Sequence, residues 1–472
     1  MPILVWFRSD LRVRDNRALW HACAAARDGV VGVFLVSPAQ WSDHGWGAPK
    51  VGFVVRSVAS LSRELAGLNI PLKVLEVPRF EGAPAALLGL ARGVGADRLC
   101  FSREYEVNER ARDEAVCDAF EAGGLRVESF HDQAIVPVHD IRTKSGKFYT
   151  VFTPFRRAWE AVAEDRDLWA PVPAPPRQPE LPIEPDEVPG SVAGFGGAPI
   201  DWDLWPAGES AACERLDAFV RARVDAYSER RDFPSADATS ELSPYLAAGV
   251  ISARTCVYAA GEHNRGRITS GHAGVVKWVQ ELVWRDFFRH VLIGFPRVCR
   301  GRAFKVDVDE SVAWSSDERA FTAWREGRTG FPIVDAGMRQ LAQTGWMHNR
   351  VRMIVAMFLT KDLLIDWRWG ERHFMRSLVD ADFASNNGGW QWSSSTGTDA
   401  APYFRIQNPT TQGKRFDAGG AFVRAFVPEL AGVDARSIHD PSAAQRAAVG
   451  YPVAMVDHAR ARERALAAFK RG

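Results

Sequence analysis

A proline-rich segment interrupts the 472-residue chain and separates two stretches of different character. Eight prolines fall between Pro171 and Gly190, and glycine-rich sequence continues to Pro199. Because proline fixes φ and lacks a backbone N–H, this segment cannot form the interior of a helix or a central strand. We therefore expect an ordered or semi-rigid connector. A chain of this length also exceeds one ordinary hydrophobic core, so two domains are expected.

The stretch before the prolines alternates between strand-like and helix-like patterns. Short apolar runs with strand character occupy residues 3–7, 30–36, 72–77, 98–101 and 126–130. Segments of helical length, such as 50–67 and 108–122, lie between them. This alternation predicts a doubly wound parallel sheet with helices on both faces. No GxGxxG follows the first strand and no GxxxxGK[ST] occurs, so neither a nicotinamide fingerprint nor a P-loop is present.

Helical patterns dominate after the connector, for example at residues 273–292 and 351–365. The expected fold class is thus α/β plus all-α: a parallel sheet, a long proline-rich linker and a helical domain. We expect an α/β domain at 1–130, an interdomain linker at 131–200 and a helical domain at 201–472.

Composition narrows the class of protein further. The apolar fraction of 46% and charged fraction of 25% are typical of soluble globular proteins. No apolar stretch reaches about 18 residues and no signal peptide is evident, so we expect no membrane span and a cytoplasmic location. Six scattered cysteines without a CxxC pair predict reduced thiols and no metal site.

Charge alone leaves the partner open. The net charge is only +1, yet basic residues gather in one C-terminal stretch. A local basic patch can hold phosphate groups, and it can equally be a solvated helix face. The residues concerned are Arg339, Arg350, Arg352, Lys361, Arg405, Lys414 and Arg415.

Tryptophan is unusually abundant, with seventeen tryptophans against seven tyrosines, and nine of them lie between positions 278 and 392. A single tryptophan normally packs in or beside a core. Here Trp278, Glu281 and Trp284 fall on adjoining parts of one helical face. A glutamate beside two tryptophans is costly unless it meets a partner, and that partner can be a ligand.

The segment 385–392, SNNGGWQW, indicates a cavity wall. Asn386 and Trp390 are four residues apart and share a face if the segment is helical. Trp390 and Trp392 are two apart, so they point in different directions. One indole can then face the interior while the other faces a cavity.

Three longer motifs give the chain a family resemblance: GWMHNR at 345–350, NNGGWQW at 386–392 and TGTDAAPYFR at 396–405. They resemble the photolyase/cryptochrome family, most closely the bacterial class I cyclobutane pyrimidine dimer photolyases. The resemblance covers essentially the whole chain and is densest from 227 to 416. It implies a monomeric carbon–carbon lyase for light-dependent DNA repair. Photoexcited reduced FAD would donate an electron to a dimer flipped out of ultraviolet-damaged DNA.

The resemblance also implies the flavin site. Tyr227, Thr239, Ser240, Leu242 and Ser243 match the loop that grips the FAD phosphates, and short hydroxyls near a helix start suit an anion. Taken alone, Thr239 and Ser240 would be read as an ordinary helix cap. Trp278, Arg285, Asp380 and Asp382 match further flavin contacts, and Asn386 matches the residue beside flavin N5. Trp390, Trp367 and Trp314 match the chain that photoreduces an oxidised flavin.

For the substrate, the resemblance implies a lesion pocket lined by Glu281, Trp284, Asn349, Met353 and Trp392. The catalytic set would be Glu281, Asn349, Met353 and Asn386, with Arg231 and Arg350 on DNA phosphates. Base flipping is a general device of enzymes, photolyases among them, that act on a buried base. Glu281 can donate a hydrogen bond only when protonated, a state that burial among tryptophans would favour.

A second, light-harvesting chromophore is expected in the α/β domain, which would make it the antenna domain. His44, Asn108, Glu109 and Arg300 match positions that bind 5,10-methenyltetrahydrofolate in some members, although Arg300 stands where a lysine is found. Taken alone, Asn108 and Glu109 merely begin a helix. An 8-hydroxy-5-deazaflavin antenna is the alternative.

The main alternative function is a cryptochrome, a blue-light receptor without repair activity. Asn386 argues against it, since plant receptors carry aspartate there, as do Met353 and Trp392, which complete a lesion pocket. The chain also ends at Gly472 without the long tail typical of signalling members. A (6-4) photolyase would carry a histidine pair where Asn349 and Met353 stand. Neither HExxH nor GxSxG occurs.

Overall fold

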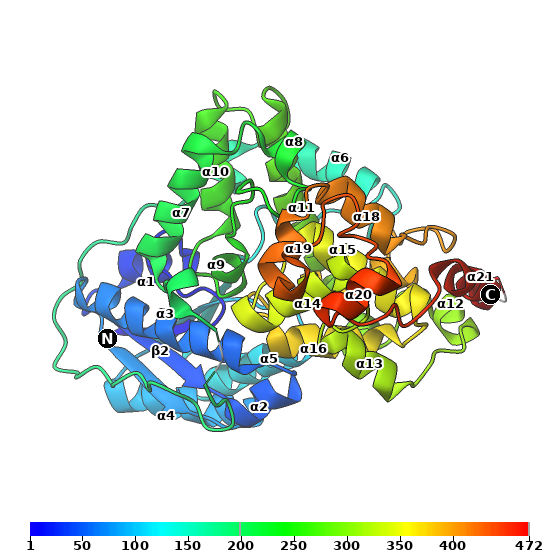
Figure 1. Ribbon diagram of the computed structural model, residues 1–472. Helices are drawn as coiled ribbons and strands as arrows, with labels where there is room; N and C mark the ends of the chain where they lie inside the picture. The colour runs from blue at the N-terminus through cyan, green and yellow to red at the C-terminus, as the bar shows by residue number, and fades with distance from the viewer. Residues whose placement is uncertain (198–199, 471–472) are drawn as a thin grey trace. The chain divides into compact units, whose positions relative to one another are not determined.

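The computed structural model describes residues 1–197 and 200–470 (Figure 1). Residues 198–199 of the predicted linker and 471–472 of the predicted helical domain lie outside the described residues. The chain forms two compact units. Among the described residues, the first unit contains 1–197, 202–225 and 240–299, and the second contains 200–201, 226–239 and 300–470.

A five-stranded parallel sheet forms the centre of the first unit, with strand order β3-β2-β1-β4-β5. The strands are β1 (Ile3–Phe7), β2 (Val30–Val36), β3 (Leu72–Glu76), β4 (Arg98–Ser102) and β5 (Arg126–Phe130). Every residue of β1 and β2 is buried. Central parallel strands are covered on both faces, which is why they read as unbroken apolar runs. The predicted parallel sheet is confirmed.

Helices cover both faces of this sheet. One face packs against α4 (Ala83–Val94) and α5 (Val107–Ala122), whose Leu87 and Phe120 share a core with Trp6. The other face receives α1 (Arg17–Ala25) and α3 (Ala48–Ala66). Figure 1 shows α3 and α4 on opposite sides of β2. The short α2 (Pro38–Asp43) follows β2.

The first unit extends beyond the predicted α/β domain. It also contains α6 (Phe152–Val162), α7 (Glu209–Ala222), α9 (Ser243–Ala247), α10 (Ala253–His263) and α11 (Ala273–Gly294). The reason is a set of buried polar bonds. Arg254 on α10 pairs with Asp15 and Asp132, and Asp286 on α11 accepts the Trp159 indole N–H at 3.0 Å. The division into compact units therefore differs from the expected boundary at 201, and the domain limits stay a prediction.

The proline-rich segment forms neither helix nor strand, as predicted. It is nevertheless ordered along the edge strand β3. The Asp186 N–H donates to Leu72 O and its carboxylate accepts from the Val74 N–H, both at 2.9 Å. A covered edge strand has fewer open backbone groups for pairing with another chain.

The second unit is built of helices. They are α8 (Tyr227–Arg230), α12 (Val306–Ser311), α13 (Glu318–Arg325), α14 (Pro332–Thr344), α15 (Asn349–Met357), α16 (Trp367–Ser377), α17 (Phe383–Ser394), α18 (Pro409–Phe416), α19 (Ala421–Phe426), α20 (Ala443–Val449) and α21 (His458–Phe469). The single helix expected at 351–365 is α15 continued by a π-helical turn, η5 (Phe358–Asp362). Such turns are frequent at functional sites.

Across residues 1–197 and 200–470, no helix is long and apolar enough to cross a membrane. In the same described residues, no group of three or more His, Cys, Asp or Glu side chains is arranged to hold a metal ion.

Candidate functional site

Asn386 is held in a fixed orientation on α17. Its side-chain amide donates to the Glu371 carbonyl oxygen at 3.0 Å, and the neighbouring Asn387 donates to the Glu371 carboxyl at 2.8 Å. Burial raises the pKa of Glu371. Asp382 caps the start of the helix by accepting from the Ser385 N–H at 3.0 Å. The segment is helical, which is the condition under which Asn386 and Trp390 share a face, and Asn386 is anchored through its donor group.

Asp380 carries an unsatisfied oxygen. One carboxylate oxygen pairs with Arg352 at 2.7 Å, while Oδ1 is buried and has no partner among the described residues. Arg352 also donates to Met347 O at 2.7 Å, which fixes the guanidinium. A buried acceptor without a donor costs about 1–3 kcal/mol unless a ligand supplies one.

The predicted lesion residues of the second unit come from α15 and α17, and these two helices pack against each other. Asn349 begins α15 and is exposed, and Met353 lies one turn further on and is half-buried. Arg350 pairs with Asp232 at 2.9 Å and reaches the Met353 sulfur at 3.8 Å. Trp392 on α17 is half-buried, whereas Trp390 is buried. The two indoles thus differ in exposure, as expected.

All three predicted electron-transfer tryptophans lie in the second unit. Trp390 packs over Gly370 of α16, so closely that a Cβ there would come within 2.0 Å of the indole. Trp367 begins α16, and Trp314 follows α12. Both of these indoles donate to Asp309 Oδ1, Trp367 at 3.1 Å and Trp314 at 3.2 Å. Asp309 was not expected from the sequence, because nothing in the pattern marks an aspartate five residues before Trp314.

Four predicted lesion and flavin residues of the first unit lie on α11: Trp278, Glu281, Trp284 and Arg285. Trp278 is buried against Phe219, with centroids 4.9 Å apart. The Arg285 guanidinium donates to the backbone carbonyls of Gln133 and Leu246.

Glu281 differs from the expectation. Its side chain is 26% exposed and pairs with Lys277 at 3.3 Å, so it is not buried among tryptophans. One turn further along α11, Trp284 stacks on Phe152 with ring centroids 3.6 Å apart. No sequence pattern predicts this contact.

The residues predicted to hold the FAD phosphates fall in both units. Ser240, Leu242 and Ser243 belong to the first, where Leu242 is buried and Ser243 begins α9. Tyr227 and Thr239 belong to the second, where the buried Tyr227 begins α8 and the Arg231 guanidinium lies 5.3 Å from its ring centroid.

Three predicted antenna residues contact one another in the first unit. His44 Nδ1 lies 3.2 Å from the Glu109 carboxylate. His44 Nε2 lies 2.9 Å from the amide nitrogens of both Asn108 and Gln40. Two amide donors on Nε2 make it the acceptor, so Nδ1 carries the proton and donates to Glu109. Arg300 is exposed and belongs to the second unit.

A small cavity in the first unit lies beside these residues. It has a volume of about 50 Å³ and is lined by Glu109, Trp46 and Lys50 among others. Its walls include residues at the carboxyl ends of β1 and β2. Because the order of strands reverses at β1, this is the position where open α/β sheets bind ligands.

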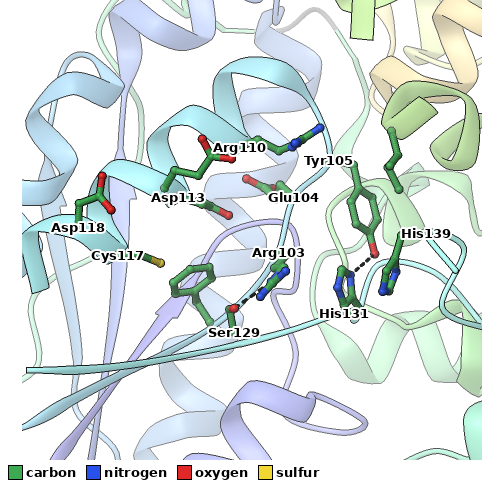
Figure 2. A pocket seen from close by; sticks show the side chains of 13 residues that line it. Arg103, Glu104, Tyr105, Arg110, Asp113, Cys117, Asp118, Ser129, His131 and His139 are labelled. Carbon is green, nitrogen blue, oxygen red and sulfur yellow. Dashed lines mark hydrogen bonds between the residues drawn. The ribbon is translucent and has the colours of Figure 1, made fainter. Parts of the chain in front are cut away.

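A larger cavity of about 480 Å³ lies at the ends of β4 and β5 (Figure 2). Tyr105, His131 and His139 form one wall: the two imidazoles stack at 3.7 Å, and the Tyr105 hydroxyl lies 3.1 Å from His131 Nδ1. Burial lowers the pKa of His131 to about 4. None of the predicted site residues lines this cavity.

Comparison with known proteins identifies the family. Residues 3–177 match the family described as DNA photolyase, and residues 278–471 match the FAD binding domain of DNA photolyase. A deoxyribodipyrimidine photo-lyase of Vibrio cholerae is 42% identical over 99% of each chain. The chain belongs to the DNA photolyase family.

Solved structures agree over the whole length. A bacterial class III photolyase from Agrobacterium tumefaciens aligns with a TM-score of 0.88 at 38% identity, covering 99% of this chain and 97% of the other. An archaeal photolyase from Sulfolobus tokodaii with two FAD molecules aligns at 0.81 and 30% identity, covering 100% of both. A Synechocystis cryptochrome aligns at 0.87 and 27% identity, covering 99% of both. One fold thus serves more than one function, and the site residues have to separate them.

Proposed function

We propose that this protein is a light-driven lyase that repairs ultraviolet-damaged DNA by splitting cyclobutane pyrimidine dimers, with FAD as its cofactor. The observation that carries the proposal is the packing of α15 against α17. This contact joins the helix of Asn349 and Met353 to the helix of Asn386 and Trp392. End-to-end identity of 42% with a deoxyribodipyrimidine photo-lyase supports the same conclusion.

The second unit has groups suited to a flavin. The unsatisfied Asp380 oxygen can accept a hydrogen bond from a ligand N–H or O–H. The Asn386 amide, tied through its nitrogen to Glu371, keeps its oxygen as a neutral acceptor on the same helix as Trp392. Reduced FAD, when bound and illuminated, supplies the electron that opens the cyclobutane ring. Trp278 and Arg285 of the first unit are proposed as further contacts.

The DNA-binding side is built from aromatic and basic residues. Trp392 is half-buried and offers a stacking surface, which is worth about 1–3 kcal/mol per base. Asn349, exposed at the start of α15, can hydrogen-bond a base edge. Arg231 and Arg350 are proposed phosphate contacts. Because the net charge is only +1, salt-dependent affinity must come from such local cations.

Glu281 is proposed to act from α11 as a donor to the flipped dimer. Its pairing with Lys277 means that the carboxylate has to exchange this partner for the lesion and take up a proton. Displacement of water by the dimer would favour the neutral form, because desolvation disfavours a charge.

We further propose that a second chromophore binds in the first unit at His44, Asn108 and Glu109, with 5,10-methenyltetrahydrofolate as the first candidate. The mutual contacts of these three residues support this proposal. The archaeal photolyase from Sulfolobus tokodaii holds two FAD molecules, which implies a light-harvesting cofactor in that protein. An 8-hydroxy-5-deazaflavin is the alternative chromophore. Arg300 is proposed as a contact in the folate case.

The proposed substrate sets the remaining expectations. A flipped dimer needs one site on one chain, so we propose a monomer, which sedimentation of the protein alone and with DNA will test. Repair of chromosomal DNA requires access to it, which is the basis for proposing a cytoplasmic location.

The deciding experiment is light-dependent repair of an oligonucleotide that contains one thymine dimer, with the purified, chemically reduced protein. We expect repair in light and none in the dark. Repair of (6-4) lesions alone, or repair in the dark, would contradict the proposal. Dimer binding without repair in light would favour the cryptochrome alternative.

A further inference from the structure

Asp309 joins two of the predicted electron-transfer tryptophans. It lies in α12, is 8% exposed, and one of its oxygens, Oδ1, accepts the indole N–H of both Trp367 and Trp314, at 3.1 and 3.2 Å. The Arg368 guanidinium pairs with its other oxygen, Oδ2, and also donates to Oδ1 at 3.4 Å. A backbone carbonyl would suffice to satisfy a buried indole, as Val355 O does for Trp324. Satisfying the two indole N–H groups therefore does not require a buried carboxylate, and its presence between them points to a further role.

The two indoles have different electrostatic surroundings. The Arg368 guanidinium lies 4.6 Å from the Trp367 ring centroid, and a cation over a ring makes loss of an electron from that ring harder. No cation lies over the Trp314 ring among the described residues. Its ring neighbour is Phe469, at 5.9 Å, edge to face. Trp367 is fully buried, whereas Trp314 is partly exposed.

This asymmetry gives electron transfer along the three tryptophans a direction. When Trp390 has lost an electron, the positive charge can move on to Trp367 and then to Trp314. This charge is less stable on Trp367, beneath the cation, than on Trp314, which contacts the carboxylate without a cation over its ring. Low effective dielectric in the interior strengthens both effects. The positive charge is therefore drawn outward, toward the partly exposed indole.

We propose that Asp309 is the positioning residue and proton acceptor of this electron-transfer chain, an inference that rests on the proposed function of the three tryptophans. Trp314 gives one electron to oxidised Trp367, which is thereby restored. The N–H bond of the Trp314 radical cation then breaks and its proton bonds to Asp309 Oδ1. The products are a neutral indolyl radical and a neutral carboxyl group. Reversal of the electron transfer then requires that Trp314 regain its proton as well as its electron, so the charge-separated state lasts longer.

Asp309→Asn tests the proton transfer, because an amide oxygen still accepts the indole N–H groups but is a far weaker base. Asp366→Asn is the matched control. Asp366 also pairs with Arg368, at 3.1 Å, and caps α16, a role that asparagine fills well. Transient absorption distinguishes the indole radical cation from the neutral radical. We expect the cation to live at least about tenfold longer in Asp309→Asn and to be unchanged in Asp366→Asn.

A measurement on the unaltered protein keeps the test independent of folding. If Asp309 takes the proton, the rate of cation loss will not depend on buffer concentration and will slow in D₂O. A rate proportional to the concentration of buffer base would show that the buffer takes the proton, and would overturn the proposal. In the dark, the indole N–H resonances of Trp314 and Trp367 should shift in Asp309→Asn and stay in place in Asp366→Asn.

The experiments distinguish an error in the electron-transfer assignment of the three tryptophans from an error in the role of Asp309. If Trp314→Phe leaves photoreduction unchanged, the assignment of the tryptophans is wrong and Asp309 has no chain to serve. If Trp314→Phe blocks photoreduction while Asp309→Asn shows the cation lifetime of the unaltered protein, the chain stands and the role of Asp309 is refuted. Repair by chemically reduced protein should be unaffected by any of these variants.

Discussion

The indole of Trp284 stacks on the phenyl ring of Phe152, with centroids 3.6 Å apart and planes inclined by 7°. Phe152 is the first residue of α6 and is buried, and its ring also meets Phe287 edge to face at 5.7 Å. One face of Trp284 is therefore already covered. The proposed contact with a flipped base has to use the opposite face or the ring edge, and Phe152 holds the indole ready for it.

Phe152→Leu should loosen Trp284 while keeping most of the buried apolar volume. An aromatic pair contributes about 0.5–1.5 kcal/mol beyond area burial, so affinity for dimer-containing DNA should fall by up to about tenfold. Affinity for intact DNA should change little, because phosphate contacts dominate it. Fluorescence titrations with matched damaged and undamaged oligonucleotides measure both values. Equal losses on the two DNAs would show that Phe152 and Trp284 are only core.

Glu281→Gln should keep more repair activity than Glu281→Ala. A glutamine donates a hydrogen bond without having to take up a proton, so it supplies the neutral donor that the proposal requires. Glu281→Ala should lower the repair yield per photon several-fold with FAD still bound. Lys277→Ala is the control, since it removes the Glu281 partner at 3.3 Å without removing the donor. An Ala variant with undiminished yield would remove Glu281 from the mechanism.

The sequence predicted the features that local periodicity and motifs indicate, namely the strands, the helices and the motif residues. It predicted little that depends on contacts between distant segments. The strands from β1 to β5 were predictable because alternation and apolar runs are local signals. Phe152 was not predictable, because its partner Trp284 lies more than a hundred residues away. Asp309 was not predictable, because Trp367 begins a different helix and no pattern marks Asp309 as the partner of Trp314. Glu281 illustrates a different limit. Helical spacing placed it between tryptophans, but the same spacing placed Lys277 one turn before it.

Gly370→Ala should disturb the electron-transfer chain at Trp390. The new Cβ would come within 2.0 Å of the indole, so the ring or the helix has to move, at a cost of about 1–3 kcal/mol. Thermal unfolding should show that loss. Photoreduction of bound oxidised flavin should slow, and we expect the same of Trp390→Phe, which removes the indole. Repair after chemical reduction should persist in both variants.

Gly93 lies in α4, and no atom lies within 4 Å of the position that a Cβ would take there. Gly93→Ala should therefore stabilise the protein by about 0.5–1 kcal/mol, in contrast to Gly370→Ala.

Lys361 should make stability rise with pH above neutrality. The side chain is fully buried in η5 and donates to Ser394 O at 3.1 Å and Ser395 Oγ at 2.9 Å. Burial lowers the pKa of Lys361 from 10.5 to about 7. Between pH 7 and 10 the unfolded chain therefore binds more protons than the folded chain, so the free energy of unfolding increases with pH.

Comparison with Lys361→Met isolates this effect from other titrating groups. The unfolding free energy of the unaltered protein should rise relative to the variant by about 1.4 kcal/mol per pH unit at most. Denaturant titrations at pH 7, 8 and 9 measure the difference. A difference that does not change with pH would mean that Lys361 stays charged, held by the two serine acceptors and by the Phe469 ring 3.4 Å away.

His44→Ala should remove the antenna and leave the flavin. His44 holds Glu109 and Asn108 through separate ring nitrogens, so its loss frees both proposed chromophore contacts at once. The purified variant should lose the near-ultraviolet band of a folate, or the blue band of a deazaflavin, while the FAD absorbance stays. His139→Ala is the matched control, because His139 lines only the larger cavity at the ends of β4 and β5. If His139→Ala removed the band and His44→Ala did not, the chromophore would belong to that larger cavity, and the assignment carried by His44, Asn108 and Glu109 would be wrong.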